Sequence, residues 1–254
     1  MKRLLVMLMC FAPLCHAEPG ADELAGLMRQ AKSTSGFSAR MNVLVTRPDG
    51  AHATPFKIAV IGRFSADKQQ LRINGISPDF VRGRFFAAES VGSGEIRVVA
   101  YRTPDKVSGV DSDARLFDSS LVLWDMFSPW WSWRRQALLA GERINGRECV
   151  MIRSSADDKH SAVREVESCV DVSARLSLRT RLYDAHHALL RSLLVGKTLQ
   201  KADSFMQTAK KLTLTDAEGV MTQVEVYSGD EQYQIPADAF SALDAERDQK
   251  SGAR

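Results

Sequence analysis

Hydrophobic and polar residues alternate along much of the chain, with the period of two that a half-buried β-strand produces. The alternation is clear over residues 37–45 and again over 56–64, and Pro48-Asp49-Gly50 supplies a turn between them. Three further strands are predicted at 71–76, 80–88 and 96–102. Because short polar turns join these runs, the N-terminal part of the chain predicts an antiparallel meander.

A break in the alternation separates this meander from a second set of strands. Residues 103–118 contain Pro104, Gly109 and several aspartates and predict a loop, and a helical patch follows over residues 121–127. Strand patterns resume near Trp133. The later strands are predicted at 147–154, 163–170, 176–183, 189–199, 205–215 and 220–227. Asp216-Ala217-Glu218-Gly219 predicts a hairpin turn between the last two.

Helical spacing occurs near the two ends of the mature chain. Asp22 is the expected N-cap of a helix whose apolar positions include Leu24 and Met28, and this helix should end near Ser33-Thr34. Near the C-terminus, Ala239, Phe240 and Leu243 are spaced so that a short helix over residues 237–245 would dock on the sheet.

These elements predict a mainly β fold class with a few helices (α+β). A sheet of about ten or eleven antiparallel strands cannot remain flat, because twist accumulates at roughly 20–25° per strand pair. We therefore expect a strongly curved antiparallel sheet or an incomplete β-barrel, plugged by helices. Closure into a barrel and coverage by helices are the two ways to hide its apolar face.

The N-terminus carries an export signal. Lys2 and Arg3 precede an apolar stretch, and small residues follow, so residues 1–17 predict a signal peptide cleaved after Ala17. The apolar stretch is shorter than the about 20 residues that span a bilayer, so no stable membrane span is expected. Cys10 and Cys15 leave a lipid-anchored product open, although neither follows the usual Leu-small-small tripeptide.

The mature chain is therefore expected in the periplasm as a single domain, residues 18–245. Residues 246–254 are rich in charge and predict a disordered tail.

Two cysteines, Cys149 and Cys169, would remain after cleavage. An oxidising compartment favours a disulfide between them. The polar stretch 155–162 predicts a hairpin whose turn, centred near Lys159, places the two cysteines opposite each other. Two buried free thiols are the alternative.

Charge and motifs exclude several function classes. The formal net charge is +3 and no polybasic run occurs, so no nucleic-acid partner is expected. Ser65 and Lys68 match a short Ser-x-x-Lys pattern, but in a predicted turn and without its companion motifs. His186-His187 predicts a solvated turn rather than a metal site, since adjacent strand residues point to opposite faces. We expect no catalytic residue, no metal and no cofactor, and hence no enzyme.

The candidate binding residues are apolar. One face of the meander and the tryptophan-rich segment are the expected lining of a ligand cavity: Phe56, Ile58, Val60, Leu71, Ile73, Val98, Ala100, Trp124, Trp130 and Trp131. In one interpretation the tryptophans of residues 128–135 cover a ligand at the cavity mouth while Arg134 and Arg135 meet its headgroup. In the other, favoured here, they begin a strand and plug one end of the barrel. Ordinary core formation predicts the same apolar face, so a hollow and a filled barrel both remain open.

The succession of elements from residue 121 to 245 resembles the periplasmic outer-membrane lipoprotein-sorting, or lipoprotein-carrier-like (LolA-like), family. The residues that carry the resemblance are Asp125-Met126-Phe127, 143–150, 182–191, 205–215 and 235–240. The resemblance implies an incomplete barrel lined by apolar side chains and plugged by helices. It also implies binding of a lipid or a lipoprotein acyl chain, with no catalytic residues to transfer.

Two functions follow from this resemblance. The first is a periplasmic carrier of an apolar ligand in outer-membrane lipoprotein sorting. The alternative is a non-catalytic envelope interaction or stress-sensing module with the same fold and an envelope protein as its partner.

Overall fold

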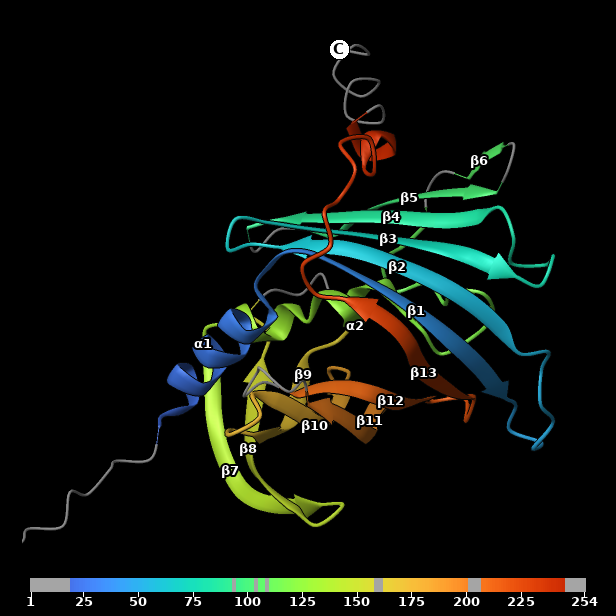
Figure 1. The fold of residues 1–254 in the computed structure, drawn as a ribbon. Coiled ribbons are helices and arrows are strands. Elements are labelled where there is room, and N and C mark those ends of the chain that lie inside the picture. The colour runs from blue at the N-terminus through green and yellow to red at the C-terminus, as the bar shows by residue number, and fades with distance from the viewer. Residues whose placement is uncertain are drawn as a thin grey trace, which may run out of the picture.

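The computed structural model describes residues 19–92, 95–102, 105–107, 110–157, 162–200 and 207–244 (Figure 1). The predicted signal peptide, residues 1–17, and the predicted tail, residues 246–254, lie outside this range. The helical elements are α1 (Ala21–Lys32), α2 (Leu123–Phe127) and the 3-10 helix η1 (Pro129–Ser132). The strands are β1 (Thr34–Thr46), β2 (Phe56–Phe64), β3 (Lys68–Ser77), β4 (Arg84–Val91), β5 (Arg97–Arg102), β6 (Asp105–Val107), β7 (Arg135–Ile144), β8 (Arg147–Ser155), β9 (Glu165–Asp171), β10 (Leu176–Tyr183), β11 (Leu189–Gln200), β12 (Gln207–Asp216) and β13 (Met221–Asp230).

The strands form one antiparallel sheet in the order β6-β5-β4-β3-β2-β1-β13-β12-β11-β10-β9-β8-β7. Strands that follow one another in the chain are neighbours in the sheet, except β6 and β7. In addition, the first strand β1 pairs with the last strand β13, where, for example, Val43 lies opposite Val224. β6 and β7 are the two edges, so the sheet is not closed. The predicted fold class, a curved and incomplete barrel plugged by helices, is confirmed. The predicted strand count was too low, partly because the short β6 lies in the stretch predicted as a loop.

Two local predictions need correction. Gly20, rather than Asp22, is the N-cap of α1, and Asp22 lies in the first helical turn. Trp130 and Trp131 lie in η1 rather than at the start of a strand. Pro129 fits the first turn of such a helix, because its missing N–H would have no partner there, and β7 begins only at Arg135.

The main core lies on the face of the sheet that curves around α2 (Figure 1). We call this the concave face, and we call residues 115–133, which connect the two sheet edges and include α2 and η1, the plug. Buried residues of α1, such as Leu24 and Met28, belong to the same core. Helices therefore hide the apolar face that the open sheet would otherwise expose.

The outer face of β4 and β5 carries a smaller cluster. Ala239, Phe240 and Leu243 pack there against Ala87 and Val99, as the helical spacing near the C-terminus predicted. The Arg72 guanidinium donates to the Ala239 carbonyl oxygen at 3.2 Å.

A third cluster, which we call the disulfide cluster, contains Cys149, Met151, Cys169 and Leu178 of β8, β9 and β10. The predicted Cys149–Cys169 disulfide is present, with the Cα atoms 5.3 Å apart. The two cysteines are not directly opposite, because Cys169 lies opposite Met151. The bond joins diagonal neighbours, and the observed pairing of β8 with β9 is shifted by two residues from the predicted one.

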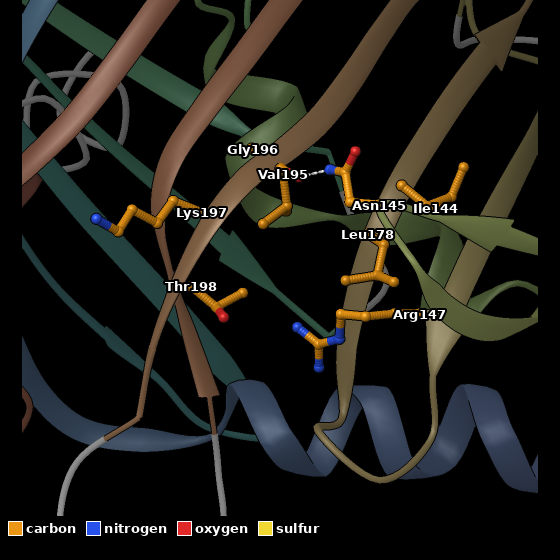
Figure 2. Close-up of a pocket in the computed structure, with 8 residues that line it drawn as sticks. All are labelled: Ile144, Asn145, Arg147, Leu178, Val195, Gly196, Lys197 and Thr198. Carbon is orange, nitrogen blue, oxygen red and sulfur yellow. Dashed lines mark hydrogen bonds between the residues drawn. The ribbon is translucent and has the colours of Figure 1, made fainter.

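The turn between β7 and β8 reaches β11. Asn145, which has a φ of +49°, donates through its side-chain Nδ2 to the Val195 carbonyl oxygen at 3.3 Å (Figure 2). Arg147, at the start of β8, donates through Nε to Asp171 Oδ2 at 2.9 Å. These contacts join the β7–β8 turn to β11 and the start of β8 to the end of β9.

Candidate ligand site beneath the plug

The structure brings all ten predicted lining residues into one core. Each of them is at most 9% exposed, and each belongs to the cluster on the concave face. Seven come from β2, β3 and β5, and the three tryptophans come from the plug. A ligand in this core would have to take the place of side chains that now fill it.

Aromatic rings of the plug cover the meander strands. The ring of Phe117 lies 5.6 Å from that of Phe56 and 5.3 Å from that of Phe86, centroid to centroid. Phe127 of α2 meets Phe64 of β2 edge-on at 6.2 Å. The sequence did not single out Phe117, because it lies in an aperiodic loop with a φ of +53°. These rings occupy the surface on which an apolar ligand would pack.

The tryptophans form a second layer within the plug. The Trp124 and Trp130 ring centroids are 5.6 Å apart, and those of Trp130 and Trp131 are 6.1 Å apart. The indole nitrogen Nε1 of Trp130 is buried and has no hydrogen-bond partner among the described residues. A buried donor without an acceptor costs about 1–3 kcal/mol. This N–H is therefore a donor that a bound ligand can satisfy.

The arginines that follow the tryptophans lie at the surface. Arg135 pairs with Asp157, with 3.1 Å between Nε and Oδ1, and both side chains are at least half exposed. Arg134 is exposed. Neither arginine lies in the core cluster with the tryptophans.

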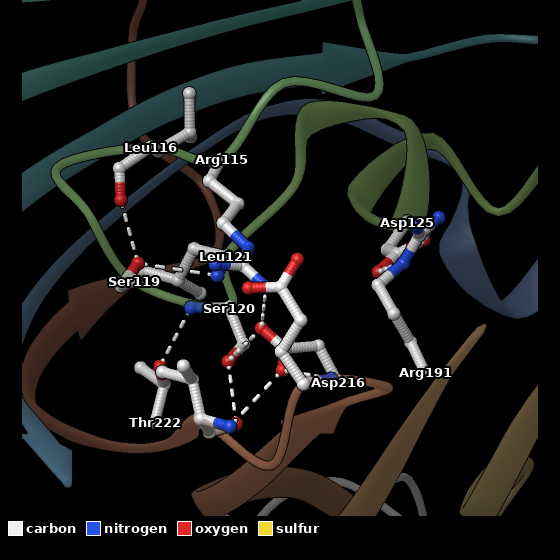
Figure 3. A network of polar contacts seen from close by, with 11 residues as sticks. Arg115, Leu116, Ser119, Ser120, Leu121, Asp125, Arg191, Asp216 and Thr222 are labelled. Carbon is white, nitrogen blue, oxygen red and sulfur yellow. Dashed lines mark hydrogen bonds and ion pairs between the residues drawn. The ribbon is translucent and has the colours of Figure 1, made fainter. Parts of the chain in front are cut away.

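The start of the plug is fastened to the β12–β13 turn (Figure 3). The Ser120 backbone N–H donates to Thr222 Oγ1 at 2.8 Å, and the Ser120 hydroxyl lies 3.1 Å from Asp216 Oδ2. Arg115 pairs with the same Asp216 oxygen at 2.7 Å and with Glu218 at 2.9 Å. Because Ser120 and Thr222 are buried, these bonds satisfy polar groups that would otherwise destabilise the core.

A buried ion pair fastens α2 to β11. Arg191 donates to both oxygens of Asp125, at 2.9 Å through Nε and 2.9 Å through Nη2 (Figure 3), and lies 3.4 Å from Asp113. Burial raises the pKa of Asp125 to about 6, although the charge of Arg191 acts in the opposite direction. One feature of the sequence indicates this ion pair. Asp125 lies among apolar residues, and a carboxylate that is buried with them needs a partner of opposite charge.

A second cation joins α1 to α2. The Lys32 ammonium donates to the Met126 carbonyl oxygen at 2.6 Å and lies 4.4 Å from the centre of the Phe64 ring. Burial lowers the pKa of Lys32 to about 7. At the other end of the plug, Gln136 Nε2 donates to the carbonyl oxygens of Trp130 and Trp133. The plug is therefore held by aromatic packing and by a few side-chain hydrogen bonds and ion pairs.

The remaining polar motifs have structural partners. The Ser65 hydroxyl donates to the Lys68 carbonyl oxygen, while the Lys68 ammonium lies 3.3 Å from Glu89, so these two side chains are not arranged as a nucleophile and its base. His186 and His187 lie in an exposed turn held by the Asp184 carboxylate, as predicted. In the described parts of the chain, no three His, Cys, Asp or Glu side chains gather as a metal site, and no helix there has the length and apolar character to cross a membrane.

Comparisons with known proteins identify a matching family and solved structures with a similar fold. A protein-family model described as an uncharacterized protein matches residues 99–244, more than half of the chain. No curated protein matches the chain.

Solved structures match over nearly their whole length. A putative outer membrane lipoprotein-sorting protein domain from Vibrio parahaemolyticus is 17% identical with a TM-score of 0.75, covering 90% of this chain and 98% of that one. A DUF1329 family protein from Desulfovibrio piger is 18% identical with a TM-score of 0.77, covering 88% and 97%. A LolA superfamily protein from Nitrosomonas europaea is 13% identical with a TM-score of 0.67, covering 88% and 98%. The chain thus belongs to the family of uncharacterized proteins whose model it matches, and it shares its fold with these three structures, one of which is a LolA superfamily protein.

Proposed function

We propose that this chain is a periplasmic carrier that binds a lipid or a lipoprotein acyl chain on the concave face of its sheet, in outer-membrane lipoprotein sorting. The observation that carries the proposal is an apolar concave face covered by a plug that is not part of the sheet. The export signal predicted at residues 1–17 supports the compartment, and the fold shared with a lipoprotein-sorting domain supports the role. In this proposal residues 18–245 act as a single domain.

The ligand would replace plug side chains rather than fill an empty space. An acyl chain on the concave face of β2, β3, β4 and β5 would take over the contacts that Phe117 makes with Phe56 and Phe86. Burial of its surface would contribute about 25 cal/mol per Å². The Trp130 N–H, which has no acceptor in the part of the chain that the structure describes, would donate to an ester or amide carbonyl at the head of the acyl chain.

Entry of the ligand requires the plug to move. The contacts that must break join the plug to the sheet: Arg191 with Asp125, and Ser120 with Thr222. Each is a side-chain contact, so the plug can leave the concave face without unpairing a strand. Helices α1 and α2 would move together as the lid.

The intrinsic fluorescence of the chain gives a direct test, because all four tryptophans lie between Trp124 and Trp133. The mature protein would be produced in a periplasm, purified without detergent, and extracted for lipid mass spectrometry. We expect stoichiometric lipid, and we expect a brominated fatty acid or phospholipid to quench the tryptophan fluorescence of delipidated protein. The matched non-brominated lipid should not quench it. The absence of both bound lipid and quenching would overturn the proposal.

One observation favours a second function. The aromatic rings of the plug already fill the concave face, as expected of a filled core in an envelope interaction or stress-sensing module. In that case the protein would purify with a stoichiometric protein partner, bind no lipid, and show no brominated-lipid quenching. The same preparation therefore separates the two functions.

A further inference from the structure

We propose that a second site, distinct from the concave face, binds a small carboxylate that carries an apolar body. The site is a pocket of about 270 Å³ between the β7–β8 turn, β10 and β11. Figure 2 shows its lining: Ile144, Asn145, Arg147, Leu178, Val195, Gly196, Lys197 and Thr198. None of these residues belongs to the cluster that contains the plug.

The pocket exists because two neighbouring strands separate. β10 and β11 pair from Tyr183 opposite Leu189 as far as Arg179 opposite Leu194, and their pairing ends there. Beyond this point β11 bulges at Gly196 while it continues to pair with β12. The β7–β8 turn reaches the separated end of β11 through the bond from Asn145 to Val195. The separation of the two strands therefore leaves a pocket that the surrounding side chains border but do not fill.

The residues that line the pocket include both apolar side chains and hydrogen-bond donors. Leu178 is 2% exposed and Val195 is 6% exposed, and with Ile144 they form the apolar part. Arg147 and Lys197 supply positive charge, and Thr198 supplies a hydroxyl (Figure 2). Because apolar and polar groups contribute about equally to the lining, the pocket suits a ligand that has both an apolar and a polar part.

The charge balance favours an anion. Asp171 already compensates Arg147, with 2.9 Å between Nε and Oδ2, whereas Lys197 has no ion-pair or hydrogen-bond partner among the described residues. Figure 2 shows the Lys197 ammonium turned away from the other lining residues, and the side chain is exposed, so rotation about its stem brings the charge to a bound anion. The carboxylate would lie beside Arg147 and Thr198, with the apolar body against Leu178 and Val195.

Gly196 provides a sharp test of this arrangement. A Cβ atom added there meets only Lys211 atoms at 3.9 Å, an ordinary contact, so a side chain is tolerated. Gly196→Glu places a negative charge at the pocket, and Gly196→Gln adds nearly the same volume without charge. We expect Gly196→Glu to weaken carboxylate binding at least tenfold relative to Gly196→Gln, and Lys197→Gln to weaken it about threefold to tenfold.

The probe is octanoate, titrated into isotope-labelled protein and followed by amide chemical shifts in nuclear magnetic resonance spectra. The expected result is saturable shifts at Gly196, Lys197, Thr198 and the Asn145 side-chain amide, with tryptophan indole signals unchanged. Acetate, which lacks the apolar body, and octan-1-ol, which lacks the charge, should bind at least tenfold more weakly. Shifts confined to the tryptophans would assign octanoate to the concave face alone and overturn the second site. Equal binding by Gly196→Glu and Gly196→Gln, or no saturable shift, would overturn it too.

Discussion

The concave face and the disulfide cluster are stabilised in different ways. The concave face is covered by a plug whose aromatic rings, such as Phe117 and Phe127, pack on the sheet and whose polar side chains bind neighbouring elements. The disulfide cluster has few buried residues, and a covalent bond between Cys149 and Cys169 fixes its strands. A small apolar cluster gains little from burial, so a cross-link contributes a larger share of its stability. Among the described residues, the plug has no covalent bond to the large core and is held by ring packing and side-chain contacts.

The largest effect is expected from Phe127→Ala in the plug. Phe127 is 2% exposed and contacts Phe64, so its removal should lower the free energy of unfolding by about 3–5 kcal/mol. Chemical denaturation followed by tryptophan fluorescence measures this loss. The matched control is Val91→Ala at a residue that is 60% exposed, where a change within about 0.5 kcal/mol is expected. A small loss for Phe127→Ala would mean that the plug contributes little to the core.

Removal of the disulfide should have the next largest effect. The double variant Cys149→Ser, Cys169→Ser opens a loop of sequence separation 20 and should lose about 3 kcal/mol. Hydrogen exchange should become faster in β8 and β9, while the plug should remain protected. Equal loss of protection in the plug would show that the two regions unfold as one unit and would remove the contrast between them.

Elements with a local periodicity were predictable from the sequence, whereas long-range contacts were not. The alternation of apolar residues predicted the meander, and helical spacing predicted the docking of Ala239, Phe240 and Leu243. The pairing of β1 with β13 joins the two ends of the sheet-forming chain, and a local sequence pattern cannot predict a contact between residues so far apart.

The candidate site was predictable only in part. The apolar lining residues followed from alternation and do lie together. Phe117 has a positive φ in an aperiodic loop, and the Arg191–Asp125 pair joins residues far apart in the chain, so periodicity could not identify either. The pocket at Gly196 arises from a bulge and from strand separation, which depend on packing rather than on the alternation of residues.

The ion pair of the plug should give stability a pH dependence at low pH. The pKa of Asp125 is raised to about 6 in the folded protein, so the folded state holds a proton that the unfolded state has already lost. The resulting stabilisation is complete below about pH 4 and is lost as pH rises through 6. Denaturation between these pH values should show a fall of about 1–2 kcal/mol. Asp125→Asn should remove this dependence of the free energy of unfolding on pH. If the dependence is unchanged in the variant, titratable groups other than Asp125 cause it.

Lys32 should act over a higher pH window. The pKa of Lys32 is lowered to about 7, so between pH 7 and its ordinary value the folded state has lost a proton that the unfolded state retains. Stability should therefore rise with pH across this window. Lys32→Met should remove the rise and increase stability at pH 7 by about 1 kcal/mol. The control is Lys211→Met, which removes an exposed lysine paired with Glu225 and should leave the rise intact.

The smallest effect on stability, and the most specific for function, is expected from Trp130→Phe. The indole N–H of Trp130 has no acceptor among the described residues. Replacing this buried residue with Phe removes an unsatisfied donor but also leaves a smaller ring in the core, and because the two effects oppose each other the free energy of unfolding should change by less than about 1 kcal/mol. If a ligand carbonyl accepts from this N–H, the same variant should bind an ester lipid about fivefold to tenfold more weakly, because one buried hydrogen bond contributes about 1 kcal/mol. A hydrocarbon analogue without the carbonyl should bind both proteins equally. Equal weakening for both ligands would mean that Trp130 acts through packing alone, whereas selective weakening for the ester would place the head of the ligand beside the plug.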